Sequence, residues 1–422
     1  MRTTVSSGLA GTSLAFLLAG LGLRSWELVI IALVPLVFLA LGALAPPSRP
    51  RLLALRTMSR DRLEVGREIE VTLEVRNEGA PLDLLEILDA IPPELSLARG
   101  SNHAVVPLDA GESFTLSYTV TPTLKGDYRL GPVRARSLDP LALAAEDTIV
   151  DVLSRVVVAP MLEDLRRTKL APRRTRPWYG QVPSRQIGIG TEFWGVRGYV
   201  PGDEVRRINW KACARLDRLF SNEYEGERSG DVILFLDARR ECFIGSDSQN
   251  PVEYGVRAAL AIAEHILATK NRVGLIVQRD VLDWVDPAYG RKQLYRILDS
   301  LVHVRSGGQW SFHRASWVVS RLFPDHALVI LISPLVDRTS LEAVTDIAAH
   351  GYDVAVVSPS PIAIERALLG DASEVDVAYR ILSMERANLI SQLRRVAPVV
   401  DWDPSTPLAL SLRRLAAWPL PG

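Results

Sequence analysis

Cysteine and histidine are scarce in this sequence of 422 residues. The two cysteines, Cys213 and Cys242, form no CxxC pair, which argues against a disulfide framework and a cysteine zinc site and suits a reducing compartment. The sequence also lacks the P-loop GxxxxGK(S/T), HExxH and GxSxG motifs. Without a complete catalytic motif, the chain is predicted not to be an enzyme.

An excess of charge of one sign is also missing. The chain has 49 Lys and Arg residues against 49 Asp and Glu residues. A general nucleic-acid binder usually carries a basic excess, so nucleic acid is not an expected partner. Hydrophobic residues are plentiful, at 48% of the chain, and they concentrate at the N-terminus. The length predicts two or three domains.

Two uncharged runs, residues 5–23 and 28–45, lie within the first 48 residues. As helices they come close to spanning a hydrocarbon core of roughly 30 Å, and the four residues between them suffice for a turn. We expect a two-helix hairpin in the lipid of the cell membrane. By the positive-inside rule, the arginines that follow place both termini and the folded domains in the cytoplasm. These arginines are Arg49, Arg51, Arg56, Arg60 and Arg62. The alternative is a cleaved signal peptide ending near Ala43-Leu44-Ala45.

Small residues recur at every fourth position of the first apolar run. Helical spacing puts them on one face, which would allow close packing against the second helix. The alternative is that small residues are simply common in membrane helices. The residues are Ser7, Gly11, Ala15 and Ala19.

Apolar and polar residues alternate in short runs between residues 52 and 160, for example over 68–75 and 113–120. Turn signals such as Asn77-Glu78-Gly79 separate the runs. This pattern predicts an antiparallel β-sandwich, which we expect to be Ig-like. No cluster of titratable residues is evident there, so the sandwich is predicted to be a spacer or interaction module.

The remaining chain divides at about residue 230. Residues 161–230 begin with a stretch rich in Arg, Lys and Pro, up to about 184, that is expected to be a solvated linker or to lie against anionic lipid. Residues 231–422 contain continuous apolar runs separated by helical patterns, which predicts a doubly wound α/β domain with a mainly parallel sheet. Functional groups in such sheets gather at the carboxyl ends of strands, which points to Asp237 and Ser333. The expected strands are 231–238, 272–278, 327–333, 352–358 and 399–402, and the expected helices are 252–269, 291–304, 311–323, 341–350 and 373–396.

An unusual mixture of arginines, acids, glycines and aromatics precedes the first of these strands. Its residues are Glu192, Phe193, Arg197, Tyr199, Pro201, Gly202, Asp203, Arg206, Asn209, Trp210, Lys211 and Arg215. This block resembles the signature of the membrane proteins called domain of unknown function family 58. Asp139-Pro140-Leu141 and Val157-Val158-Ala159-Pro160 resemble the end of that family's sandwich.

The resemblance covers essentially the whole chain. It implies that residues 231–422 form a von Willebrand factor A-like domain. It also implies association with a MoxR-type AAA+ ATPase and sometimes with transglutaminase-like proteins. The biochemical activity of the family is undefined, so the resemblance names no reaction.

The signature block has two readings from its residue types. Its charges could pair within the chain, with Arg206 and Trp210 partly buried, and lock the block onto the first strand of the α/β domain or hold that domain against the sandwich. Alternatively, Arg, Trp and Tyr favour the centres of protein interfaces, so the block could be a docking surface.

A metal site of the von Willebrand factor A type carries Asp-x-Ser-x-Ser after its first strand. Here Arg239 and Glu241 stand in place of both serines that would follow Asp237, and Ser333 and Asp337 lie near the later strand end. An arginine brings positive charge to the position of the cation, so we expect a degenerate site without Mg²⁺ or another cofactor. Asp237 is expected to pair with Arg239 or Arg240 instead.

Two functions remain open. The first is a non-enzymatic, membrane-anchored adaptor that docks an AAA+ ATPase or its client through the signature block and the α/β domain. The alternative is a membrane-bound hydrolase or cell-envelope factor with a site near Asp237 and Asp337.

Overall fold

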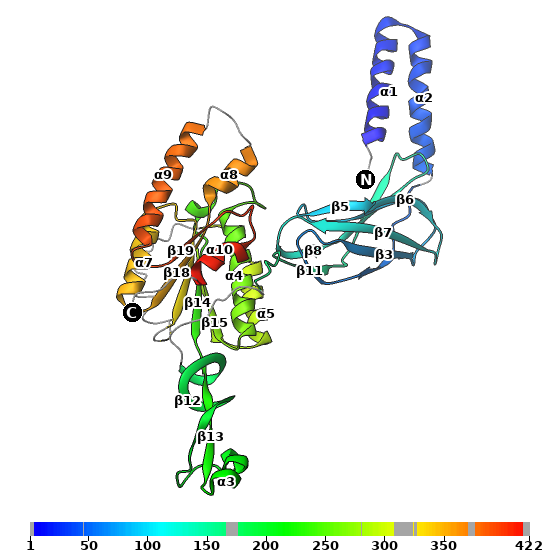
Figure 1. The fold of residues 1–422 in the computed structure, drawn as a ribbon. Helices are drawn as coiled ribbons and strands as arrows, with labels where there is room; N and C mark the ends of the chain where they lie inside the picture. The colour runs from blue at the N-terminus through cyan, green and yellow to red at the C-terminus, as the bar shows by residue number, and fades with distance from the viewer. Residues whose placement is uncertain are drawn as a thin grey trace. The chain divides into compact units, whose positions relative to one another are not determined.

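Figure 1 shows the computed structural model. It describes residues 4–44, 46–165, 176–279, 281–307, 324, 327–369 and 376–416. Side chains are described for these residues except 176–192, 194, 224–229 and 414–416. The chain divides into two compact units, Met1–Ala159 and Pro160–Gly422.

The first unit begins with two helices, α1 (Thr4–Leu23) and α2 (Trp26–Leu44). Both are long and apolar enough to cross a membrane, and most of their residues are exposed. The predicted pair of apolar helices is therefore confirmed. The two helices qualify as membrane spans by their length and composition, and an N-terminal signal sequence meets the same criterion.

The predicted packing face of α1 is wrong. The small residues Ser7, Gly11, Ala15 and Ala19 are exposed. The buried residues recur every seven positions instead, and they are Ser6, Ser13 and Gly20. The Ser13 hydroxyl donates a hydrogen bond of 2.8 Å to the Ala32 carbonyl oxygen in α2. Residues spaced by four shift by about 40° per step around a helix, so they do not stay on the face that contacts a nearly antiparallel neighbour. Residues spaced by seven remain close to that contact face, which we call the seam.

Three β-sheets complete the first unit, with strand orders β1-β3-β7-β5, β10-β9-β4-β6 and β2-β11-β8. The described strand pairs are antiparallel except β2 with β11. The predicted period-two pattern is confirmed in β3, where alternate side chains from Ile69 to Val75 are buried. The strands are β1 (Leu52–Met58), β2 (Arg62–Glu64), β3 (Ile69–Asn77), β4 (Leu82–Asp89), β5 (Leu95–Gly100), β6 (His103–Leu108), β7 (Ser113–Pro122), β8 (Gly126–Leu130), β9 (Val133–Leu138), β10 (Ala145–Val150) and β11 (Ser154–Ala159).

The interior of this β region contains a charge cluster, contrary to the expectation that none is present. The Arg56 guanidinium donates to both carboxylate oxygens of Asp89, at 3.0 and 2.5 Å, and both side chains are fully buried. The Tyr118 hydroxyl donates to Asp89 at 2.7 Å. Burial, followed by the Asp89 carboxylate, raises the pKa of Tyr118 well above its ordinary value. These residues come from separate strands, so their spacing in the sequence does not predict the cluster.

The second unit contains a six-stranded sheet in the order β16-β15-β14-β17-β18-β19. All neighbours are parallel except β15 and β16. The predicted α/β region with a mainly parallel sheet is confirmed. The strands are β14 (Asp231–Asp237), β15 (Arg272–Gln278), β16 (Leu282–Ala288), β17 (Leu328–Ile332), β18 (Asp353–Pro359) and β19 (Val399–Trp402).

Helices cover both faces of this sheet, because alternate residues of β14 belong to different cores. Leu234 and Leu236 pack with α4, whereas Ile233 and Phe235 pack with α7 and α9. The predicted helix at 311–323 lies outside the described residues. The described helices from β14 onward are α4 (Pro251–Ala268), α5 (Arg291–Val302), α7 (Thr339–Ala349), α8 (Pro361–Leu369), α9 (Asp376–Leu393) and α10 (Leu408–Ala416), with the short turn η2 at Arg240–Cys242.

Candidate functional site

The signature block lies on a two-stranded antiparallel ribbon that leads into β14 (Figure 1). Its strands are β12 (Arg176–Gly198) and β13 (Phe220–Ser229). Between them the chain forms a short turn, η1 (Val205–Arg207), and a short helix, α3 (Trp210–Leu216). We call residues 195–223 the arm tip. Residues 176–184, predicted to belong to a linker, instead form the start of β12.

A fork of ion pairs closes the loop of the arm tip. The Arg197 guanidinium donates to both carboxylate oxygens of Asp203 at 2.7 Å, and its Nε atom lies 2.9 Å from Glu223. The hydrogen bonds from Arg197, and then from the Val200 backbone amide, lower the pKa of Asp203. Gly202 has φ +109°, a conformation that favours glycine in the turn. This loop therefore has a defined shape.

Asn209 fixes the start of α3. Its side-chain oxygen accepts from the Ala212 amide at 3.0 Å, and its side-chain nitrogen donates to Asn222 at 2.7 Å. The Tyr199 amide donates to the Leu219 carbonyl oxygen at 2.9 Å, which ties the other side of the loop. The arm tip is thus held by its own capping and backbone contacts.

Several signature side chains point away from this framework. Trp210 is 64% exposed, and the Arg206 side chain is 79% exposed beside the carboxylate of Glu204. The prediction that Arg206 and Trp210 are partly buried is therefore wrong, because a two-stranded ribbon offers no second layer to cover them. The other exposed signature residues are Phe193, Pro201, Gly202, Lys211 and Arg215, while the side chain of Glu192 lies outside the described part of the structure.

Four of the five degenerate metal positions, Asp237, Arg239, Ser333 and Asp337, gather at the carboxyl edge of the sheet. Arg239 Nε lies 2.8 Å from Asp237 Oδ1, and Arg239 Nη1 lies 2.9 Å from Asp337 Oδ2. The Ser333 hydroxyl donates to Asp237 at 2.8 Å. The predicted ion pair of Asp237 with an arginine is formed by Arg239. Glu241 is exposed in η2 and stands apart from these contacts.

Burial and pairing act in opposite directions on the pKa values of Asp337 and Arg239. The side chains of Asp237 and Arg239 are 0% and 4% exposed, whereas that of Asp337 is 31% exposed. Burial opposes ionisation of Asp337, but hydrogen bonds from Arg239 and Thr339 outweigh it and lower the pKa of this carboxyl. Burial likewise opposes the charge of Arg239, and the bonds to Asp237 and Asp337 reverse that effect and raise its pKa. Arg239 thus links Asp237 and Asp337 in an Asp–Arg–Asp bridge.

The guanidinium occupies the space between the two carboxylates. Both Asp237 oxygens already accept from Arg239 or Ser333, and Asp337 accepts from Arg239 and Ser340. Among the described residues, no group of three or more His, Cys, Asp or Glu side chains could hold a metal ion. The arrangement therefore joins the ends of β14 and β17 with an internal cation.

Sequence reasoning missed a second buried arginine at the same edge. Arg386 of α9 donates to the Pro334 carbonyl oxygen at 2.6 Å, to the Ser358 hydroxyl at 2.8 Å and to Asp401 at 2.7 Å. It thus connects the chain beyond β17 with β18 and β19. In the sequence, Arg386 is one polar residue among many in a helix, and only the tertiary structure distinguishes it.

Comparison with known proteins gives one curated relative, "Uncharacterized protein YeaD" of Bacillus subtilis (strain 168). It is 28% identical over 221 residues, which cover 51% of this chain and 54% of that protein. The match thus spans about half the length of the relative.

Solved structures similar to this chain include the CARDB domain of the PF1109 protein from Pyrococcus furiosus, with 19% identity, a TM-score of 0.19 and coverage of 27% of this chain and 91% of that one. Native alpha-2-macroglobulin from Escherichia coli, from domain MG7 to its C-terminus, has 21% identity, a TM-score of 0.23 and coverage of 31% and 20%. At these scores neither carries an argument. The arm tip and much of the α/β region, at residues 195–365, match the family described as "Protein of unknown function DUF58".

Proposed function

We propose that this chain is a non-enzymatic, membrane-anchored adaptor that uses its arm tip to dock a partner protein. The observation that carries the proposal is the exposure of large apolar side chains on a loop whose backbone is internally fixed. Val205, Trp210 and Leu216 are all more than half exposed. Exposed hydrophobic groups of this kind lose contact with water when a partner covers them, and a fixed backbone lowers the entropic cost of binding.

Basic residues accompany the apolar side chains. Arg206, Lys211, Arg215 and Arg218 are exposed on the same tip. Tryptophan and arginine are enriched among the residues that dominate protein interfaces. The chemistry favours a partner surface with an apolar recess and acidic groups around it.

The partner we propose is a MoxR-type AAA+ ATPase, with or without its client. The reason is the family resemblance of the signature block together with the match of residues 195–365. ATP hydrolysis would then belong to the partner. On this proposal the two apolar helices anchor the chain, with both termini and the folded units on the cytoplasmic side, because arginines follow the second helix.

We also infer finer fold assignments. The order β16-β15-β14-β17-β18-β19, with only β16 antiparallel, supports a von Willebrand factor A-like α/β domain. The antiparallel sheets β1-β3-β7-β5 and β10-β9-β4-β6 support an Ig-like sandwich. Both assignments rest on topology and on the family resemblance.

The hydrolase alternative draws less support from the geometry. A general base must reach a proton of the substrate or of an attacking water. The Asp237 carboxylate is buried and bonded to Arg239 and Ser333. Asp337 is the more accessible of the two acids, and it too is engaged by Arg239.

Photo-crosslinking in native membranes tests the proposal. A photoreactive amino acid replaces Trp210 in the arm tip or, as the matched control, the exposed Trp284 in β16. We expect the Trp210 position alone to crosslink an AAA+ ATPase that mass spectrometry identifies. Equal crosslinking from both positions, or none from Trp210, would contradict docking through the arm tip.

A further inference from the structure

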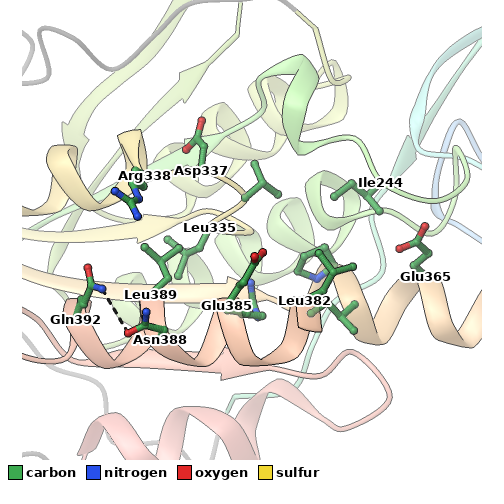
Figure 2. A pocket seen from close by; sticks show the side chains of 14 residues that line it. Ile244, Leu335, Asp337, Arg338, Glu365, Leu382, Glu385, Asn388, Leu389 and Gln392 are labelled. Carbon is green, nitrogen blue, oxygen red and sulfur yellow. Dashed lines mark hydrogen bonds between the residues drawn. The ribbon is translucent and has the colours of Figure 1, made fainter. Parts of the chain in front are cut away.

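An open groove of about 650 Å³ runs beside α9 at the carboxyl edge of the sheet. Figure 2 shows its walls. Leu382, Glu385 and Leu389 lie along the α9 side, and the chain after β17 supplies Leu335 and Arg338 on the opposite side. The groove lining thus mixes leucine side chains with charged and amide groups.

Two of the three acidic groups of the groove, Glu365 and Glu385, are available to a ligand. Asp337 and Arg386 also line it, but they are engaged by Arg239 and by Asp401 respectively. Glu365 and Glu385 form no ion pair or side-chain hydrogen bond with any residue that the structure describes. Two carboxylates beside leucines complement a side chain with an aliphatic stem and a cationic head.

Charges of opposite sign lie toward the two ends of the groove. Figure 2 places Arg338 toward the Gln392 end of α9 and Glu365 toward the other end. Glu385 lies between them. These charges therefore favour one orientation of a cationic ligand along α9, with its positive charge near Glu365 and Glu385.

We propose that this groove binds an extended segment of a partner protein that carries alternating aliphatic and Lys or Arg residues. The lining residues of α9 extend from Leu382 to Gln392, a rise of about 15 Å. An extended chain rises about 3.3 Å per residue, so the bound segment has roughly four or five residues. Its alternate side chains point to opposite sides, so aliphatic side chains can contact the leucines while cationic ones reach Glu365 and Glu385.

This inference does not rest on docking through the arm tip. The groove lies on the α/β region, and its residues do not overlap the arm tip. An adaptor with both surfaces would hold one partner at the arm tip and a basic segment of another protein in the groove.

Fluorescence anisotropy with the full chain in uncharged lipid nanodiscs tests the inference. The probe is a labelled five-residue peptide of alternating leucine and lysine, compared with the same peptide carrying glutamine for lysine. We expect the lysine peptide to bind at least about tenfold more tightly, since two partly exposed charge pairs each contribute a few-fold. Glu365→Gln and Glu385→Gln should each weaken binding about three- to fivefold, and the double variant about tenfold.

Glu342→Gln is the matched control, because Glu342 is an exposed glutamate of α7 outside the groove. It should leave the affinity unchanged. Equal affinity for both peptides, or an equal loss in the control, would overturn the inference. Binding that appears only after Arg173 and Arg174 are changed to glutamine would assign the groove to this chain's own basic run. A dimer of the wild-type chain that Glu385→Gln dissociates would assign it to a second copy. If the Glu365→Gln and Glu385→Gln variants still capture the ATPase, a failure of the groove inference leaves the adaptor proposal intact.

Discussion

Arg239→Met is expected to destabilise the α/β region by about 4 kcal/mol. The change keeps an unbranched side chain of similar reach but removes the cation between Asp237 and Asp337. Breaking a buried ion pair by removing one partner typically costs about 3–5 kcal/mol, because the remaining charge is stranded. Asp237 is fully buried and carries most of this cost. Asp337 is about a third exposed, so solvent screening limits its share to at most about 1 kcal/mol.

Hydrogen–deuterium exchange of the β14 peptide in the full-length chain measures this effect. A loss of about 4 kcal/mol raises the open population on the order of a thousandfold, and exchange accelerates accordingly. Arg240→Met is the matched control, because Arg240 is the exposed neighbour of Arg239 and its loss should change stability by less than about 0.5 kcal/mol. Asp237→Asn combined with Arg239→Met should recover at least about 2 kcal/mol, since no buried charge is then left alone. Similar exchange in the two arginine variants would refute the account of the cluster.

Three further predictions concern other parts of the chain. Pairing lowers the pKa of Asp337 in the folded state, so its contribution to stability is fully present above its unfolded-state pKa near 4 and is lost as the pH falls through its lower folded-state pKa. Asp337→Asn should flatten this acid dependence of β14 exchange. Tyr118→Phe should cost about 1.5–3 kcal/mol in exchange of the β7 peptide, since it removes a buried hydrogen bond to the charged Asp89, and an unchanged rate would contradict that role. Gly20→Leu should separate the two N-terminal helices, because an added Cβ would lie 2.8 Å from a Val29 methyl group, whereas Gly11→Leu meets open space; cysteine crosslinking between the helices should fall in the first variant alone, and equal loss in both would contradict the seam.

The central strands of the α/β sheet could be predicted because they are continuous apolar runs in the sequence. β14 is buried along its whole length, so its seven residues read as one apolar run. The edge strand β16 escaped prediction, since Asp283, Asp286 and Pro287 give it the composition of a loop. Charges and proline are common on edge strands because they discourage pairing with another chain.

The charged clusters show why the rest of the site could not be predicted. Asp237 and Arg239 are two residues apart, and their pairing was among the expected contacts. Asp337 joins them from 98 residues away, and Arg56 meets Asp89 across 33 residues. Spacing along the chain carries no record of such contacts. The burial of the arm tip was mispredicted for a different reason, because a segment rich in Arg and Trp is equally typical of a buried anchor and of an exposed interface.

Capture of the ATPase by arm-tip variants tests the central claim most directly. Full-length wild-type chain, Trp210→Ala, Leu216→Ala and the control Trp284→Ala are purified from native membranes, and co-purified AAA+ ATPase is quantified alongside β14 exchange. We predict that the two arm-tip variants lose capture at least tenfold while β14 exchange stays at the wild-type rate, because both side chains are exposed, and that Trp284→Ala captures normally. Undiminished capture by Trp210→Ala and Leu216→Ala, with the same wild-type exchange, would contradict docking through the arm tip.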